Sequence, residues 1–93
     1  MTTPTSSQPD ATAVWGDIRG CINTVVPALA NVTIELDTDF STLSVTSIEM
    51  ITVIFEVEEL YDIIIVDAGL DVFDTPAEFV DIVLMLLKRK EAA

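Results

Sequence analysis

A short motif that occurs twice in the chain fixes where two of its helices can begin. Thr46 is followed three residues later by Glu49, and Thr75 is followed three residues later by Glu78. In such a capping box the threonine hydroxyl accepts the backbone N–H of the glutamate, and the carboxylate accepts the backbone N–H of the threonine. Pro76 supports the second box, because a proline at the first helical position lacks only an N–H that would have no helical partner there. The two boxes therefore predict helices that begin at residues 47 and 76.

Three longer helices and one short one account for the apolar pattern. The first runs from Ala11 to a stop at Pro27, with apolar residues spaced by four, four and three positions. The second is expected over residues 47–61, after which a β-branched run and a glycine break the period, and the last over residues 76–90. A short third helical turn is expected over Leu70, Val72 and Phe73. The sequence thus predicts an all-α fold, a four-helix bundle with three longer helices and a short third helix.

The other segments divide into two tails and a long connection around one domain. Residues 1–10 are mostly Thr, Ser and Pro, too polar to offset the entropy of ordering them, and are expected to form a disordered tail. Residues 11–90 are expected to form the domain, and residues 91–93 a C-terminal tail. Residues 28–45 show no sustained period, which predicts a long loop anchored by scattered apolar side chains. Loops of this length usually have a function.

The distribution of charge excludes several kinds of partner. The chain has 16 acidic against 4 basic residues and a formal net charge of -12. Such a charge repels phosphate backbones and anionic lipids, so we expect neither nucleic-acid binding nor attachment to an acidic membrane. Between Gly20 and Leu87 there are thirteen acidic residues and no lysine or arginine. Partners that bind this part of the chain should therefore be basic.

The sequence also lacks the residues that most catalytic and metal sites use. It has no histidine, and Cys21 is the only cysteine. Without histidine the chain lacks the usual zinc ligand and the usual group for proton transfer near neutral pH, and one cysteine cannot form an intrachain disulfide. We therefore expect neither a metal site nor an enzyme. The longest apolar runs are far shorter than the roughly 20 residues of a membrane-spanning helix. With no signal peptide recognised, we expect a cytoplasmic, monomeric protein without membrane insertion.

The helix expected over residues 47–61 carries apolar residues on two opposite faces. The broader stripe is expected to pack into the core and comprises Met50, Val53, Ile54, Val57, Leu60 and Tyr61. The opposite stripe consists of Ile48, Ile51 and Phe55, and it is surrounded by four acidic residues: Glu49, Glu56, Glu58 and Glu59. Two interpretations stay open for this second stripe. Either the long loop covers it, or it is a docking surface whose acidic rim attracts a basic partner.

The segment FSTLSVTSI from Phe40 to Ile48 and the Glu-rich helix after it resemble the acyl carrier protein family, and the resemblance is collinear from about residue 13 to residue 90. The family signature is an aspartate, a serine and a leucine, usually after a glycine, at the start of an acidic second helix. Thr46, Ser47 and Ile48 stand at these positions, and Ser44 replaces the glycine. Thr46 keeps the cap but lacks the charge that helps to engage the metal of the enzyme that installs the prosthetic group. We therefore expect a specialised carrier.

The resemblance implies that Ser47 carries 4'-phosphopantetheine through a phosphodiester and holds acyl groups as thioesters on the terminal sulfur of this arm. The implied partners are a phosphopantetheinyl transferase and the acyl-loading, acyl-transfer or synthase enzymes of fatty acid or specialised lipid biosynthesis, with basic docking surfaces. The implied docking residues are Ile48, Glu49, Ile51, Phe55, Glu56, Glu58 and Glu59. Candidate contacts of the acyl chain, between the second and third helices, are Ile51, Val57, Ile65 and Phe73. Ordinary core packing explains Val57 and Ile65 better.

Three other functions are compatible with parts of the sequence. A peptidyl or aminoacyl carrier shares the fold and the prosthetic group, but its usual triplet is flanked by glycines that this chain lacks. A calcium-binding loop is suggested by Asp37, Asp39 and Ser41, but Thr42 stands where an EF-hand needs glycine and Ile48 where it needs a bidentate glutamate. The third is an acidic helical interaction module. The strong acidity favours an acyl carrier over the other carriers.

Overall fold

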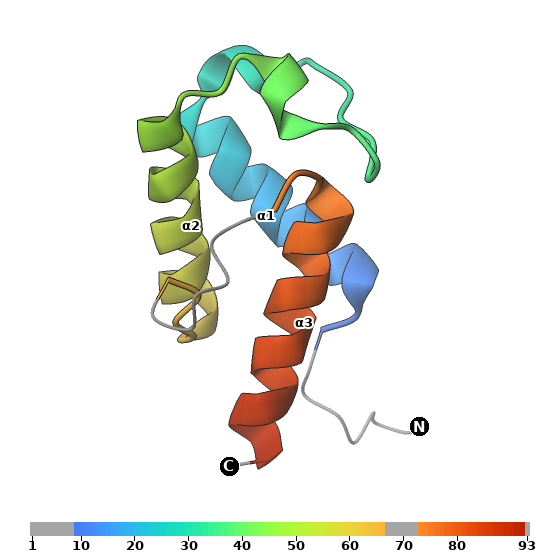
Figure 1. Cartoon of the computed structure of the whole chain (residues 1–93), viewed down its shortest axis with the longest axis vertical. Coiled ribbons are helices and arrows are strands. Elements are labelled where there is room, and N and C mark those ends of the chain that lie inside the picture. The colour runs from blue at the N-terminus through green and yellow to red at the C-terminus, as the bar shows by residue number, and fades with distance from the viewer. Residues whose placement is uncertain (1–8, 67–72, 93) are drawn as a thin grey trace.

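The computed structural model describes residues 9–66 and 73–92, and within these ranges the regular structure is helical with no β-strand (Figure 1). The elements are α1 (Ala11–Val25), the short 3-10 turns η1 (Pro27–Leu29) and η2 (Phe40–Leu43), α2 (Ser47–Tyr61) and α3 (Pro76–Ala92). The helix α1 packs against both α2 and α3, and the connection that carries η1 and η2 crosses one end of the three helices (Figure 1). The all-α prediction is therefore confirmed.

The predicted short third helix falls largely outside the described residues. Leu70 and Val72 lie in the undescribed range, while Phe73 is described and is not helical. What the described ranges contain is the three longer helices of the predicted bundle. None of these helices combines the length and the apolar character needed to cross a membrane.

Both capping boxes form as predicted. At α2 the backbone N–H of Glu49 donates to Thr46 Oγ1 at 3.1 Å, and the backbone N–H of Thr46 donates to Glu49 Oε1 at 2.9 Å. At α3 the reciprocal bonds between Thr75 and Glu78 are both 3.3 Å. Because each box pairs two N–H groups that would otherwise lack partners, the start of each helix is fixed locally. The end of α2 is also confirmed, whereas α3 continues two residues beyond the predicted end.

The N-terminus of α1 differs in one respect from the expected tail. The carboxylate of Asp10, which the prediction places in the disordered tail, accepts the backbone N–H of Ala13 at 2.9 Å and is the N-cap of α1. Aspartate is among the most favourable N-cap residues. The signal for this helix start was therefore present in the sequence one residue before the predicted domain.

The core is formed by side chains from all three helices and from the segments between them. The buried residues are Val14, Ile18, Ile22, Leu29, Ile34, Phe40, Val53, Ile54, Val57, Ile63, Ile65, Pro76, Phe79, Val80, Val83 and Leu87. No polar or charged residue is buried among the residues described. A purely apolar core gives this small domain its stability through the area removed from water.

The prediction that Leu60 packs into the core is wrong. Its side chain is 55% exposed, although the helical period places it beside Val57 on the core face. After α2 the chain turns at Asp62, which has φ 56, and returns so that Ile63 and Ile65 are buried at this end of the core. The returning segment supplies the apolar contacts that the last turn of α2 was expected to supply.

The connection over residues 28–45 is more ordered than the predicted irregular loop. It contains η1 and η2, and Arg19 of α1 donates through Nη2 to the carbonyls of Leu29, at 2.7 Å, and Val32. Backbone bonds from Ala77 to the Leu36 carbonyl, at 3.0 Å, and from Phe40 to the Asp74 carbonyl, at 2.8 Å, attach it to the start of α3. The connection is thus held at the end of the bundle, away from the exposed face of α2.

Candidate functional site

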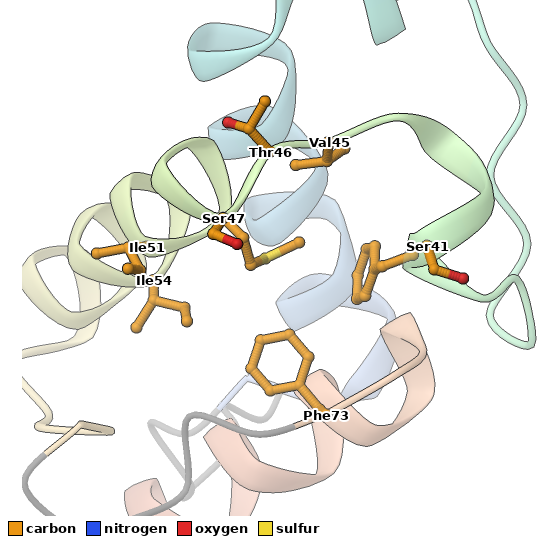
Figure 2. A pocket seen from close by; sticks show the side chains of 9 residues that line it. Ser41, Val45, Thr46, Ser47, Ile51, Ile54 and Phe73 are labelled. Carbon is orange, nitrogen blue, oxygen red and sulfur yellow. The ribbon is translucent and has the colours of Figure 1, made fainter.

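Ser47 is exposed at the first position of α2 and lines a pocket of about 280 Å³ (Figure 2). The other lining residues come from α2, from the connection before it and from the chain before α3: Phe40, Ser41, Val45, Thr46, Met50, Ile51, Ile54 and Phe73. Three of the nine lining residues carry hydroxyls, Ser41, Thr46 and Ser47, and the other six have aliphatic, aromatic or thioether side chains. An exposed serine hydroxyl therefore stands beside a hollow with a mixed lining.

The wall of the pocket nearest α3 is an aromatic cluster. The ring of Phe73 stacks on Phe79 with centroids 4.3 Å apart at 28°, and it meets Phe40 edge-on at 5.8 Å and 65°. Phe79 is fully buried and Phe40 is 7% exposed, so two rings of the cluster are anchored in the core. Such arrangements add to the burial of each ring. Figure 2 shows Phe73 facing the α2 side of the pocket, where Ser47 lies.

The position of Ser47 on the helix determines its electrostatic surroundings. The N-terminal end of a helix carries the positive end of the dipole, which favours an anion bound there. The nearest acid on the helix, Glu49, has its carboxylate bonded to the Thr46 N–H in the capping box. A negatively charged group attached to Ser47 would therefore gain from the dipole.

The second apolar stripe of α2 is exposed, which rules out the interpretation that the long loop covers it. Ile48 is 78% exposed, Ile51 47% and Phe55 53%, and the long connection does not cover them. Single exposed apolar side chains are common, but three on one helix face form a contiguous patch. Ile51 belongs both to this patch and to the pocket, so the two features share an edge.

The four acidic residues around this stripe have different surroundings. Glu56 and Glu59 are exposed. The carboxylate of Glu49 is used in the capping box, and Glu58 Oε2 accepts the backbone N–H groups of Ile65, at 2.6 Å, and Val66, at 3.0 Å. Two of the four predicted docking glutamates thus serve the fold as well.

The four predicted acyl contacts divide into two that line the pocket and two that belong to the core. Ile51 and Phe73 line the pocket with Ser47, whereas Val57 and Ile65 are fully buried in the core and do not line it. The sequence missed most of the lining: Phe40, Val45, Met50 and Ile54. Met50 and Ile54 were assigned to the core face of α2. Their helical positions, on the same side of the helix as Ser47, could have indicated that they lie beside Ser47 in the pocket.

No family model, curated protein or solved structure matches this chain. The function has to be argued from the site and from the resemblance in sequence.

Cys21, the only thiol, is a poor candidate for a nucleophile. Partial burial raises the pKa of the Cys21 thiol, and the nearby carboxylates of Glu56 and Asp17 raise it further. Since the thiolate is the reactive form, the thiol is protonated and unreactive near neutral pH. Tyr61, which donates a hydrogen bond from its hydroxyl to the Asp17 carboxylate, also has its pKa raised, mainly by burial.

The acidic residues do not form a metal site in the part of the chain that is described, where no cluster of three or more potential ligand side chains occurs. Asp39, at the third position of the segment that resembles a calcium loop, instead accepts the backbone N–H of Ser41 at 2.8 Å and is the N-cap of η2. This hydrogen bond lowers the pKa of the Asp39 carboxyl. The aspartate thus has a local structural role.

A second hollow, of about 200 Å³, lies between the starts of α1 and α3. Trp15, Leu36 and Val80 are among its lining residues, and Asp81 is the only ionisable one. Its polar lining residues are Thr12 and Asp81, and neither lies in the segment from Phe40 to Ile48 that resembles a carrier. Of the two hollows, the one beside Ser47 is the better candidate for chemistry.

Proposed function

We propose that this protein is a specialised acyl carrier in which Ser47 is the attachment site of 4'-phosphopantetheine. The observation that carries the proposal is the exposed Ser47 hydroxyl at the N-terminus of α2, beside a pocket whose lining includes six apolar side chains and no charged one. A phosphodiester formed there would place its charge at the positive end of the helix, worth about 0.3–1 kcal/mol. In the attachment the Ser47 oxygen attacks the phosphorus next to the pantetheine in coenzyme A, the pyrophosphate bond breaks, and adenosine 3',5'-bisphosphate leaves with the hydroxyl proton. The arm then ends in a free thiol that carries the cargo as a thioester.

The pocket supports an acyl cargo over an aminoacyl one. Its walls include Ile51, Ile54 and the stacked ring of Phe73, which favour an alkyl chain, and no charged side chain lines it. An aminoacyl group would bring an ammonium charge to this surface, and a charge without a partner is unfavourable in an apolar environment. The peptidyl or aminoacyl carrier stays the second candidate because it shares the arm.

The exposed stripe supports docking by a basic enzyme. Ile48, Ile51 and Phe55 offer an apolar contact beside the attachment serine, and the surrounding carboxylates would increase the rate of encounter with a cationic surface. We propose a phosphopantetheinyl transferase and acyl-loading, acyl-transfer or synthase enzymes as the partners. The proposal extends to a short helix that completes a four-helix bundle and to a monomer in the cytoplasm.

The test is the intact mass of the protein after co-expression with several phosphopantetheinyl transferases. We expect one added phosphopantetheine group on the wild type and none on Ser47→Ala. Ser41→Ala is the matched control, because Ser41 is also an exposed serine that lines the same pocket, and this variant should be modified like the wild type. Loss of modification in both variants, or an unmodified wild type with every transferase, would contradict the proposal. Loading with fatty acyl and aminoacyl donors then separates the two kinds of carrier.

A further inference from the structure

The glutamates around the exposed stripe of α2 differ in whether their carboxylates are available to a partner. Glu49 and Glu58 accept backbone N–H groups of this chain. Glu56 and Glu59 are exposed and form no hydrogen bond or ion pair with the residues that the structure describes. Four acids that are equivalent by charge and by neighbourhood in the sequence therefore fall into two pairs.

Glu58 fastens the segment that follows α2. Its carboxylate accepts the N–H groups of Ile65 and Val66, and its backbone carbonyl accepts those of Asp62 and, at 3.1 Å, Ile63. Hydrogen bonds to a charged acceptor are the stronger ones. Ile65 is fully buried, so these bonds hold the backbone of a residue whose side chain is part of the core. We refer to the two bonds from Ile65 and Val66 as the Glu58 clasp.

The two pairs also relate differently to the site. At ~100° per residue around the axis of α2, Glu59 and Glu56 lie about 20° and 80° to one side of Ile48. We call this side, which is turned away from Ser47, the outer edge of the stripe. Ile51 lies about 60° to the other side, towards Ser47 and the pocket. Glu58 lies on that pocket edge, about 80° from Ile48.

We infer that Glu58 acts within the chain, through the clasp, and that a basic partner is attracted along the outer edge of the stripe by Glu56 and Glu59. The cations of the partner then contact the outer edge, its apolar residues contact Ile48 and Phe55, and its active site reaches Ser47 at the pocket edge. The clasp is independent of the proposed function, whereas the orientation of the partner rests on the proposed function.

The clasp is tested by amide hydrogen exchange at Ile65 and Val66. Glu58→Gln keeps an oxygen acceptor, so exchange should stay within about twofold of the wild type; Glu58→Ala removes it, so exchange should be about tenfold faster or more. Glu59→Ala is the matched control and should leave both amides unchanged. If Glu58→Ala does not fold, Glu58→Asp, whose shorter side chain withdraws the carboxylate from the amides, replaces it. Unchanged exchange in the variant that folds would overturn the clasp.

The orientation is tested by the kinetics of phosphopantetheine transfer, with a transferase that modifies the wild type and coenzyme A as donor. At low salt Glu56→Gln and Glu59→Gln should each raise the KM for the carrier about threefold or more, and the difference should shrink at high salt. Glu58→Gln should change KM less than twofold. An equal rise for Glu58→Gln and Glu59→Gln would overturn the assignment. An unmodified wild type would instead refute the proposed function, and the exchange experiment would still decide the clasp.

Discussion

Ser44 offers a test of how the connection before α2 is built. It ends η2 with φ 58 and ψ 31, the left-handed conformation, and it is exposed. This conformation costs an L-residue roughly 1–2 kcal/mol, whereas glycine adopts it freely. Glycine also makes the unfolded chain more flexible, which removes about 0.4–1 kcal/mol of the gain. We therefore expect Ser44→Gly to increase the free energy of unfolding by about 0.5–1 kcal/mol.

The measurement is urea denaturation followed by far-UV circular dichroism. A gain of this size raises the melting temperature of a domain this small by about 2–8 °C. Ser41→Gly is the matched control, because Ser41 lies inside η2 without a positive φ. There glycine should lower the stability by roughly 0.5–1 kcal/mol. If both substitutions change the stability in the same direction, backbone strain at Ser44 is not the cause.

Three further predictions concern Tyr61, Thr46 and Cys21. The absorbance of Tyr61, the only tyrosine, should titrate well above pH 10, because its pKa is raised in the folded protein; a titration near pH 10 would contradict the raised pKa. Because the folded pKa lies above the unfolded value near 10, the free energy of unfolding falls as the pH rises above about 10, and Tyr61→Phe should lose less stability in that range. Thr46→Ala should lower the free energy of unfolding by about 0.5–2 kcal/mol in urea, with Thr46→Ser close to the wild type. Cys21 should react with iodoacetamide slowly in the folded protein and fast in urea, and equal rates would refute the raised thiol pKa.

The features that the sequence predicted best depend on residues a few positions apart. The starts of α2 and α3 follow from capping boxes, in which both partners lie within four residues. Such local signals need no knowledge of the tertiary structure, and this is why they were sufficient.

The features that the sequence did not predict depend on where distant segments come to lie. The helical period places Leu60 in the core, but it does not contain the reversal at Asp62 that brings in Ile63 and Ile65. The pocket wall joins Phe40 and Phe73, which are 33 positions apart in the sequence and meet only after folding. The second stripe of α2 is exposed because the connection over residues 28–45 is held at the end of the bundle, and the sequence alone does not give that position.

The Glu58 clasp is one of several bonds between a carboxylate of this acidic chain and its own backbone. Carboxylates of Asp10, Asp39, Glu49, Glu58 and Glu78 all accept backbone N–H groups. Hydrogen bonds to a charged acceptor are the stronger ones, and at a helix N-terminus the dipole adds to them. These bonds offset part of the self-repulsion that a net charge of -12 imposes. Replacing an acid by lysine removes both roles together, whereas glutamine at a glutamate position keeps the acceptor and removes the charge. Glutamine scanning along α2 is therefore the substitution that separates attraction of a partner from maintenance of the fold.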